Sequence, residues 1–121
     1  MTEGLRGAVL VFIGGGIGAL SRYLASLLVG GPLATLTVNL AGCFAIGLIA
    51  AAVPAFAGNL RLFFLTGILG GFTTMSAFSL DALTLWQRGQ GSSALAYVAA
   101  TVLGSLAAVA VGAAVGTIMA R

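Results

Sequence analysis

Three hydroxyl side chains recur at a helical spacing in the second half of the chain. Tyr97, Thr101 and Ser105 are separated by steps of four residues, which places them on one face of a helix. Their neighbours are mainly Ala, Val and Leu. A single Ser or Thr in such a setting can bond back to its own helix. Three successive hydroxyls favour a polar track along this face.

A second polar group interrupts an apolar run between Gly70 and Ser79, with the sequence GGFTTMSAFS. Glycine costs about 1 kcal/mol in a helix interior, and Thr and Ser prefer helix caps. The segment therefore predicts a helix that breaks near Gly70–Thr74 and restarts. Broken backbone inside a membrane is tolerated where protein or water satisfies it, and such breaks often mark ion sites. A packing kink with back-bonded hydroxyls is the alternative.

An amide lies in another apolar run, at Asn39, with Thr35 and Thr37 close before it. An amide in lipid must face protein, another helix or water, because its polar groups are costly to leave unpaired. Two interpretations stay open for Asn39. Its amide either holds two helices together or contacts a permeating ion.

Several kinds of chemistry are disfavoured by what the chain lacks. It has no His and no Lys, its only acids are Glu3 and Asp81, and Cys43 is its only cysteine. A transition-metal site and a His-dependent hydrolytic triad are therefore not expected, and we do not expect an enzyme. Asp81 falls toward the end of its run, so no proton relay is expected. The remaining hydroxyls, amides and aromatic edges of Phe72 and Phe78 suit a small anion better than a cation.

The elements that must position these groups are membrane spans. The 121 residues are 60% apolar and 6% charged, with a mean hydropathy of +1.19, whereas soluble domains carry about 25% charged residues. The net charge of +3 comes from scattered arginines and does not indicate nucleic acid. Four apolar runs reach the length of about 20 residues that a membrane helix needs. We predict one four-helix transmembrane domain over residues 1–121, with spans at about 7–29, 33–56, 61–86 and 93–120.

Short connections and paired glycines predict how these spans pack. Because only a few residues join them, consecutive spans are expected to be antiparallel neighbours. Gly14 with Gly18, and Gly112 with Gly116, have the spacing that lets two helix backbones approach closely in lipid. We expect these glycines to serve packing.

Three motifs of the chain resemble the CrcB/Fluc family of small fluoride channels. They are GGIGALSRY at 15–23, TLTVNLAGCF at 35–44 and GGFTTMSAFS at 70–79. The four-span layout and the hydroxyl series at 97, 101 and 105 are also similar to the family. The third motif is the most specific of them, and the resemblance covers essentially the whole chain.

The resemblance implies an all-α integral membrane protein, with the third helix broken near its middle, that forms an antiparallel homodimer of dual topology. It implies a passive, fluoride-selective channel of a prokaryotic inner membrane that exports cytoplasmic fluoride. A negative-inside potential of 100 mV drives each anion outward by about 2.3 kcal/mol, so no energy source is needed.

The resemblance also implies roles for individual residues. Arg22 would be a vestibule or structural residue, and the backbone carbonyls of Gly70 and Thr73 would hold a structural sodium ion at the dimer interface. Met75 stands where the family usually has Phe, which removes a ring edge at that position. The residues implied in the anion pathway are Thr35, Asn39, Met75, Ser76, Phe78, Ser79, Tyr97, Thr101 and Ser105.

Two other functions share the four-span layout. A small multidrug or cation exporter needs a carboxylate embedded in the membrane to exchange protons for its cargo, and no span centre carries one. A non-transporting membrane assembly subunit would use every Ser and Thr for packing, and the expected break in the third span argues against it.

Overall fold

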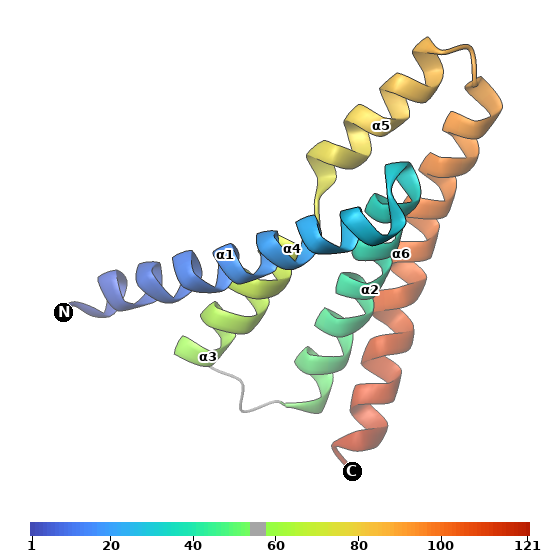
Figure 1. Ribbon diagram of the computed structural model, residues 1–121. Helices are drawn as coiled ribbons and strands as arrows, with labels where there is room; N and C mark the ends of the chain where they lie inside the picture. The colour runs from blue at the N-terminus through green and yellow to red at the C-terminus, as the bar shows by residue number, and fades with distance from the viewer. Residues whose placement is uncertain (54–57) are drawn as a thin grey trace.

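The computed structural model describes residues 1–53 and 58–121, and these form helices joined by short connections (Figure 1). Four helical stretches are long and apolar enough to cross a membrane, and the third is broken. The helix of the second span stops at Ala52, before the predicted end of that span at Phe56. Phe56 itself lies outside the described residues. The elements are α1 (Glu3–Val29), α2 (Gly31–Ala52), α3 (Asn59–Arg61), η1 (Leu62–Leu69), α4 (Gly70–Phe72), α5 (Met75–Gln87) and α6 (Gly91–Met119).

The predicted glycine pairs lie at the closest helix contacts. A Cβ atom at Gly14 or Gly18 would overlap backbone atoms of η1, and one at Gly112 or Gly116 would overlap backbone oxygens of α2. The packing role of these glycines is confirmed, since a larger side chain would force the helices apart.

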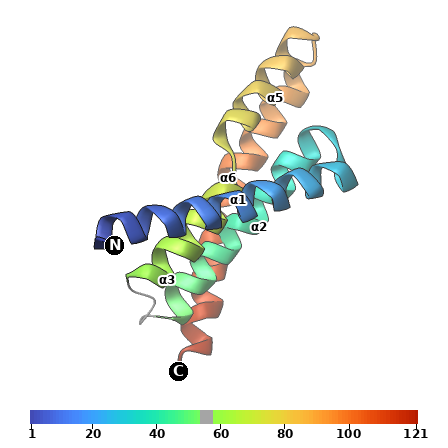
Figure 2. The same ribbon diagram turned by 60° about the vertical axis from the view of Figure 1, so that its left-hand side comes forward.

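The main helix pairs run in the same direction along the chain. In α1, Gly14 lies against Phe63 and Gly67, and Gly18 lies further along against Ile68. The same order holds between α2 and α6, which lie side by side in Figures 1 and 2. The expectation of antiparallel neighbours therefore does not describe the main interfaces. The first span, α1, packs mainly on η1 and α4 of the third span, and the second span, α2, packs mainly on α6. α1 crosses α2 steeply in both views.

The predicted break occurs at Thr73 and Thr74. Both residues have extended backbone, with φ −84° and ψ 157° at Thr73 and φ −152° and ψ 118° at Thr74. The Thr74 hydroxyl accepts a hydrogen bond of 3.2 Å from the Ala77 N–H, which is the capping role expected of a Thr before a restarting helix. After the break, α5 leaves the direction of α4 and runs beside the first part of α6 (Figure 1).

A π-helical segment that the sequence did not predict comes before the break. It spans Leu62–Leu69 and packs on the glycine face of α1. The wider π turn is rare and often occurs near functional sites. Here it leads directly into α4 and the extended residues.

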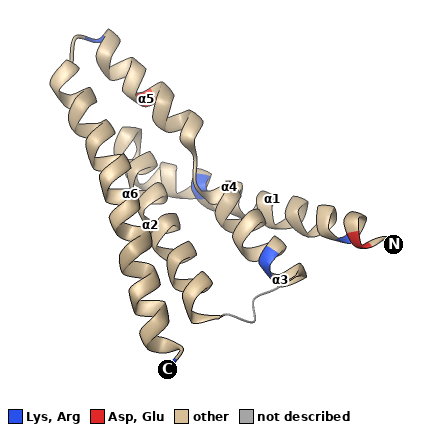
Figure 3. Ribbon diagram, turned by 180° about the vertical axis from the view of Figure 1, so that it is seen from behind, with Lys and Arg blue, Asp and Glu red and all other residues tan. Residues whose placement is uncertain are grey.

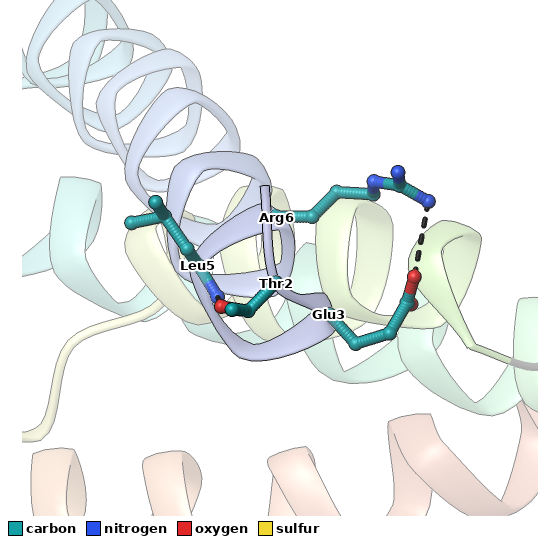
Figure 4. Close-up of polar contacts among 4 residues, drawn as sticks. All are labelled: Thr2, Glu3, Leu5 and Arg6. Atoms are coloured by element: carbon teal, nitrogen blue, oxygen red, sulfur yellow. Dashed lines mark hydrogen bonds and ion pairs between the residues drawn. The ribbon is translucent and has the colours of Figure 1, made fainter.

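Charged residues are sparse along the helices, as Figure 3 shows. At the start of α1, Thr2 caps the helix by accepting from the Leu5 N–H at 3.2 Å (Figure 4). Arg6 and Glu3 form an exposed ion pair of 3.1 Å one turn apart. Arg22 and Asp81 differ from the other charges because they lie well inside α1 and α5.

Candidate ion pathway beside the helix break

Asn39 holds the broken segment from the side of α2. Its Nδ2 donates to the Thr74 carbonyl at 3.0 Å, and its Oδ1 accepts from the Thr74 N–H at 2.8 Å. The side chain is buried, with 7% of its surface exposed. The amide thus replaces helix hydrogen bonds that the extended backbone has lost, which confirms the interhelical interpretation of Asn39. This contact does not exclude that Asn39 also contacts a permeating ion. The Asn39 Nδ2 carries two hydrogens, and among the described residues only one hydrogen bond donated by Nδ2 is present.

A cavity of about 340 Å³ lies where α2, the break and α6 meet. Its wall is largely apolar, with polar residues contributed by α2, by the break and by α6. Five residues of the predicted anion pathway line this cavity: Asn39, Met75, Phe78, Thr101 and Ser105. The structure therefore brings together residues that lie in three separate helices.

The hydroxyl of Thr101 is the unusual group of this cavity. The residue is buried, with 6% of its surface exposed. Within the described parts of the chain, its Oγ1 has no hydrogen-bond partner. Buried polar groups almost always have one, so the Thr101 hydroxyl is a donor available to a ligand in the cavity, which Asn39 also lines.

Phe78 and Met75 lie in different surroundings, although both line the cavity. Phe78 is 8% exposed, and its ring lies 5.4 Å from that of Tyr97, centroid to centroid, at a tilt of 44°. Met75, the first residue of α5, is 71% exposed. The Phe78 ring is thus fixed by packing, whereas the Met75 thioether is free to change its rotamer.

Asp81 contacts two of the predicted pathway residues. Its Oδ2 accepts from the Thr35 hydroxyl at 2.8 Å and from the Tyr97 hydroxyl at 3.0 Å. The protons of both hydroxyls therefore point to a carboxylate, and neither residue lines the cavity beside Thr101. Sequence reasoning assigned no role to Asp81. The available signal was that a lone acid within an apolar span is by default a functional candidate.

Arg22 contacts the broken span from α1. Its Nε donates to the Gly71 carbonyl at 3.2 Å. It also lines a second cavity of about 180 Å³ together with Thr35 and Thr74. This arrangement gives Arg22 a structural contact and a cationic face on a small polar cavity, in keeping with the vestibule or structural role expected for it.

Ser76 and Ser79 do not line the cavity beside Thr101. The Ser76 hydroxyl lies 3.3 Å from that of Thr74. The Ser79 hydroxyl donates to the Met75 carbonyl at 2.9 Å, one turn back in α5. Both residues are exposed. The Ser76 hydroxyl therefore contacts the capping hydroxyl of Thr74, and the Ser79 hydroxyl bonds back to its own helix.

The carbonyls of Gly70 and Thr73 lose their regular helical donors at the break. In an unbroken helix these carbonyls would accept from the N–H groups of Thr74 and Ala77. The Thr74 N–H instead donates to Asn39, and the Ala77 N–H donates to the Thr74 hydroxyl. Carbonyl oxygens of unwound backbone are ligands that suit sodium. The two positions therefore fit the expected sodium site in ligand chemistry.

These features define an all-α, multi-pass membrane protein whose third span is broken beside a partly polar cavity. The family model for the CrcB-like protein, Camphor Resistance (CrcB), matches residues 9–113. The chain belongs to this family.

Three similar proteins share one name. The chain is 51% identical over 112 residues to the fluoride-specific ion channel FluC of Paracoccus denitrificans, covering 88% of this chain and 90% of that protein. It is 48% identical over 113 residues to the protein of the same name in Chelativorans sp., covering 86% and 90% of the two chains. The FluC of Mesorhizobium japonicum is 46% identical over 112 residues, with coverage of 86% and 90%.

Proposed function

We propose that the protein is a passive, fluoride-selective channel of the bacterial inner membrane that releases cytoplasmic fluoride down its electrochemical gradient. The observation that carries this proposal is the buried Thr101 hydroxyl, which has no hydrogen-bond partner among the described residues and lines the cavity beside the break together with Asn39. Fluoride is small and strongly hydrated, so a pathway must replace its water with good hydrogen-bond donors. The family membership and the names of the relatives support the same ion.

Export by such a channel needs no chemical energy. A negative-inside potential favours outward movement of an anion by about 2.3 kcal/mol per 100 mV. Hydroxyl and amide groups can donate hydrogen bonds to the passing anion without taking up a proton or a second ion. The mechanism is therefore passage along fixed donors, with the ring edge of Phe78 as a further contact for the anion.

Ion efflux from liposomes tests this function directly. Purified protein is reconstituted into vesicles loaded with potassium fluoride or potassium chloride, and valinomycin allows potassium to follow the anion. An ion-selective electrode should record rapid fluoride release and little chloride release. Equal release of both ions would contradict selectivity. Drug-dependent proton exchange would favour the cation exporter, and no ion movement would favour the assembly subunit.

The proposed functional unit is an antiparallel homodimer of dual topology. Many large apolar side chains of α1 and α6 are exposed, which suits contact with lipid or with a second copy. Four crossings place Arg6, Arg61 and Arg121 on one side and Arg88 on the other, with Arg22 nearer to Arg88. The weak bias of positive charge favours insertion in both orientations. Cysteine-accessibility mapping on a Cys43→Ser background should find both, and a single orientation would contradict dual topology.

A structural sodium ion is part of the same proposal. The Gly70 and Thr73 carbonyls would hold it, and two antiparallel copies would supply both pairs of oxygens. The ion would neutralise carbonyl dipoles that the break leaves without helical donors. Replacing sodium by N-methylglucamine should lower the thermal stability of the dimer. An unchanged melting temperature in that exchange would refute the sodium site.

A further inference from the structure

Two sulfur-containing residues of different helices line the cavity beside Thr101. Cys43 is a free cysteine of α2, half-buried and one turn beyond Asn39. Met75 enters from the start of α5. The other two methionines, Met1 and Met119, lie near the chain ends. A thiol and a thioether in one cavity offer two soft ligands beside its hydroxyl and amide groups.

We propose that Cys43 and Met75 form a binding site for a soft monovalent cation, Cu⁺ or Ag⁺. Thiolate and thioether sulfur are the ligands that select such ions, while hard cations prefer oxygen. Met75 is exposed and has three rotatable side-chain bonds, so its sulfur can adjust to an ion held by Cys43. On binding, the S–H bond of Cys43 breaks, the proton passes to water and a metal–sulfur bond forms. The metal keeps its oxidation state.

The surroundings of the two sulfurs fit an ion of this kind. The cavity wall is largely apolar, which suits a thiolate–cation pair whose charges cancel. The unpaired Thr101 hydroxyl shows that the cavity has a polar group open to a ligand, and its oxygen can act as a weak third ligand. Residues 1–53 and 58–121 contain no cluster of three His, Cys, Asp or Glu side chains that could hold a metal. A two-sulfur site therefore favours an ion with low coordination demands.

The consequence for transport rests on the proposed fluoride function. A cation bound to Cys43 and Met75 would occupy the cavity that Thr101 and Asn39 also line. The site should therefore make the channel sensitive to silver. Silver binding itself is independent of whether the cavity conducts fluoride.

Direct binding of silver tests the site. Purified protein is titrated with silver nitrate in chloride-free buffer, and bound metal is measured by elemental mass spectrometry after desalting. We expect one silver ion per chain. Cys43→Ser should abolish binding, and Met75→Leu should weaken it at least tenfold. Met119→Leu removes an exposed thioether far from the cavity and should bind silver as the wild type does. Size-exclusion profiles show that the variants are folded.

Several outcomes would overturn the site. Unchanged silver affinity in Met75→Leu would mean that Cys43 binds the ion alone. Met75→Phe also lacks the sulfur, so its silver affinity should match that of Met75→Leu. Retained binding in Cys43→Ser would place the metal elsewhere. In fluoride-loaded liposomes, silver should block efflux in the wild type and in Met119→Leu but not in Cys43→Ser. If silver binds with these dependences and efflux continues, the metal site stands and the route of fluoride through this cavity is wrong.

Discussion

Replacing Thr101 by valine removes a buried hydroxyl and leaves a side chain of similar volume. In the structure, Oγ1 has no partner among the described residues. A buried polar group in that state costs about 1–3 kcal/mol. Thr101→Val should therefore leave the free energy of unfolding unchanged or raise it by up to that amount. A substitution in a transmembrane helix that stabilises the fold is uncommon, because most substitutions destabilise.

The same substitution should slow fluoride. A hydrogen bond to an ion is worth about 1.5–3 kcal/mol. If the hydroxyl replaces a water molecule of the passing ion, its loss raises the barrier by that energy, which slows flux roughly 10- to 100-fold. Stability and flux should thus move in opposite directions, which a simple packing defect would not produce.

A matched control lies on the same helix. The Thr117 hydroxyl is exposed and donates to the Ala113 carbonyl at 2.9 Å, so Thr117→Val changes the same atoms away from the cavity. Fluoride efflux at equal protein and thermal unfolding in detergent are measured for both variants. Unchanged flux in Thr101→Val would refute the role of this hydroxyl. Equal slowing in Thr117→Val would show that the assay reports a general effect of losing a hydroxyl.

Three other predictions have distinct expected results. Asp81→Asn should lower stability by about 1–2 kcal/mol, because its two hydroxyl donors lose a charged acceptor; thermal unfolding measures this, and an unchanged melting temperature would contradict it. Phe78→Ile should lower fluoride efflux and Met75→Phe should raise it, since a ring edge is lost in one and gained in the other; the opposite pattern would reverse the two roles. Gly112→Val should prevent close packing on α2 and abolish the folded protein in size exclusion, whereas Gly16→Ala, at an open position, should remain folded.

The sequence predicted the features that depend on local chemistry. The break follows from the conformational cost of Gly70 and Gly71 and from the capping preference of Thr74, all close together in the chain. The burial of Asn39 follows from the cost of an amide in lipid. Local patterns of this kind need no knowledge of which helices are neighbours.

Features that depend on partners far apart in the chain were not predictable. Thr35 and Asp81 are 46 positions apart, and nothing in either segment specifies that their side chains meet. Paired glycines indicate close packing but do not name the partner helix, so the parallel pairing of α2 with α6 was missed. The π-helix at Leu62–Leu69 was missed as well, because nothing in its apolar sequence distinguishes a π-helix from an α-helix.

The break borders both the cavity beside Thr101 and the cavity beside Arg22. Thr74 lines the cavity beside Thr101 and also the one beside Arg22. An ion that passes between them would move along the Thr74 backbone, which Asn39 holds with both ends of its amide. A substitution at Asn39 would therefore change the shape of the break and remove a donor together, so a loss of flux there has two explanations. The Thr101 hydroxyl makes no hydrogen bond to any other described residue. Removing this hydroxyl therefore tests its role in conduction without breaking a contact that holds the fold.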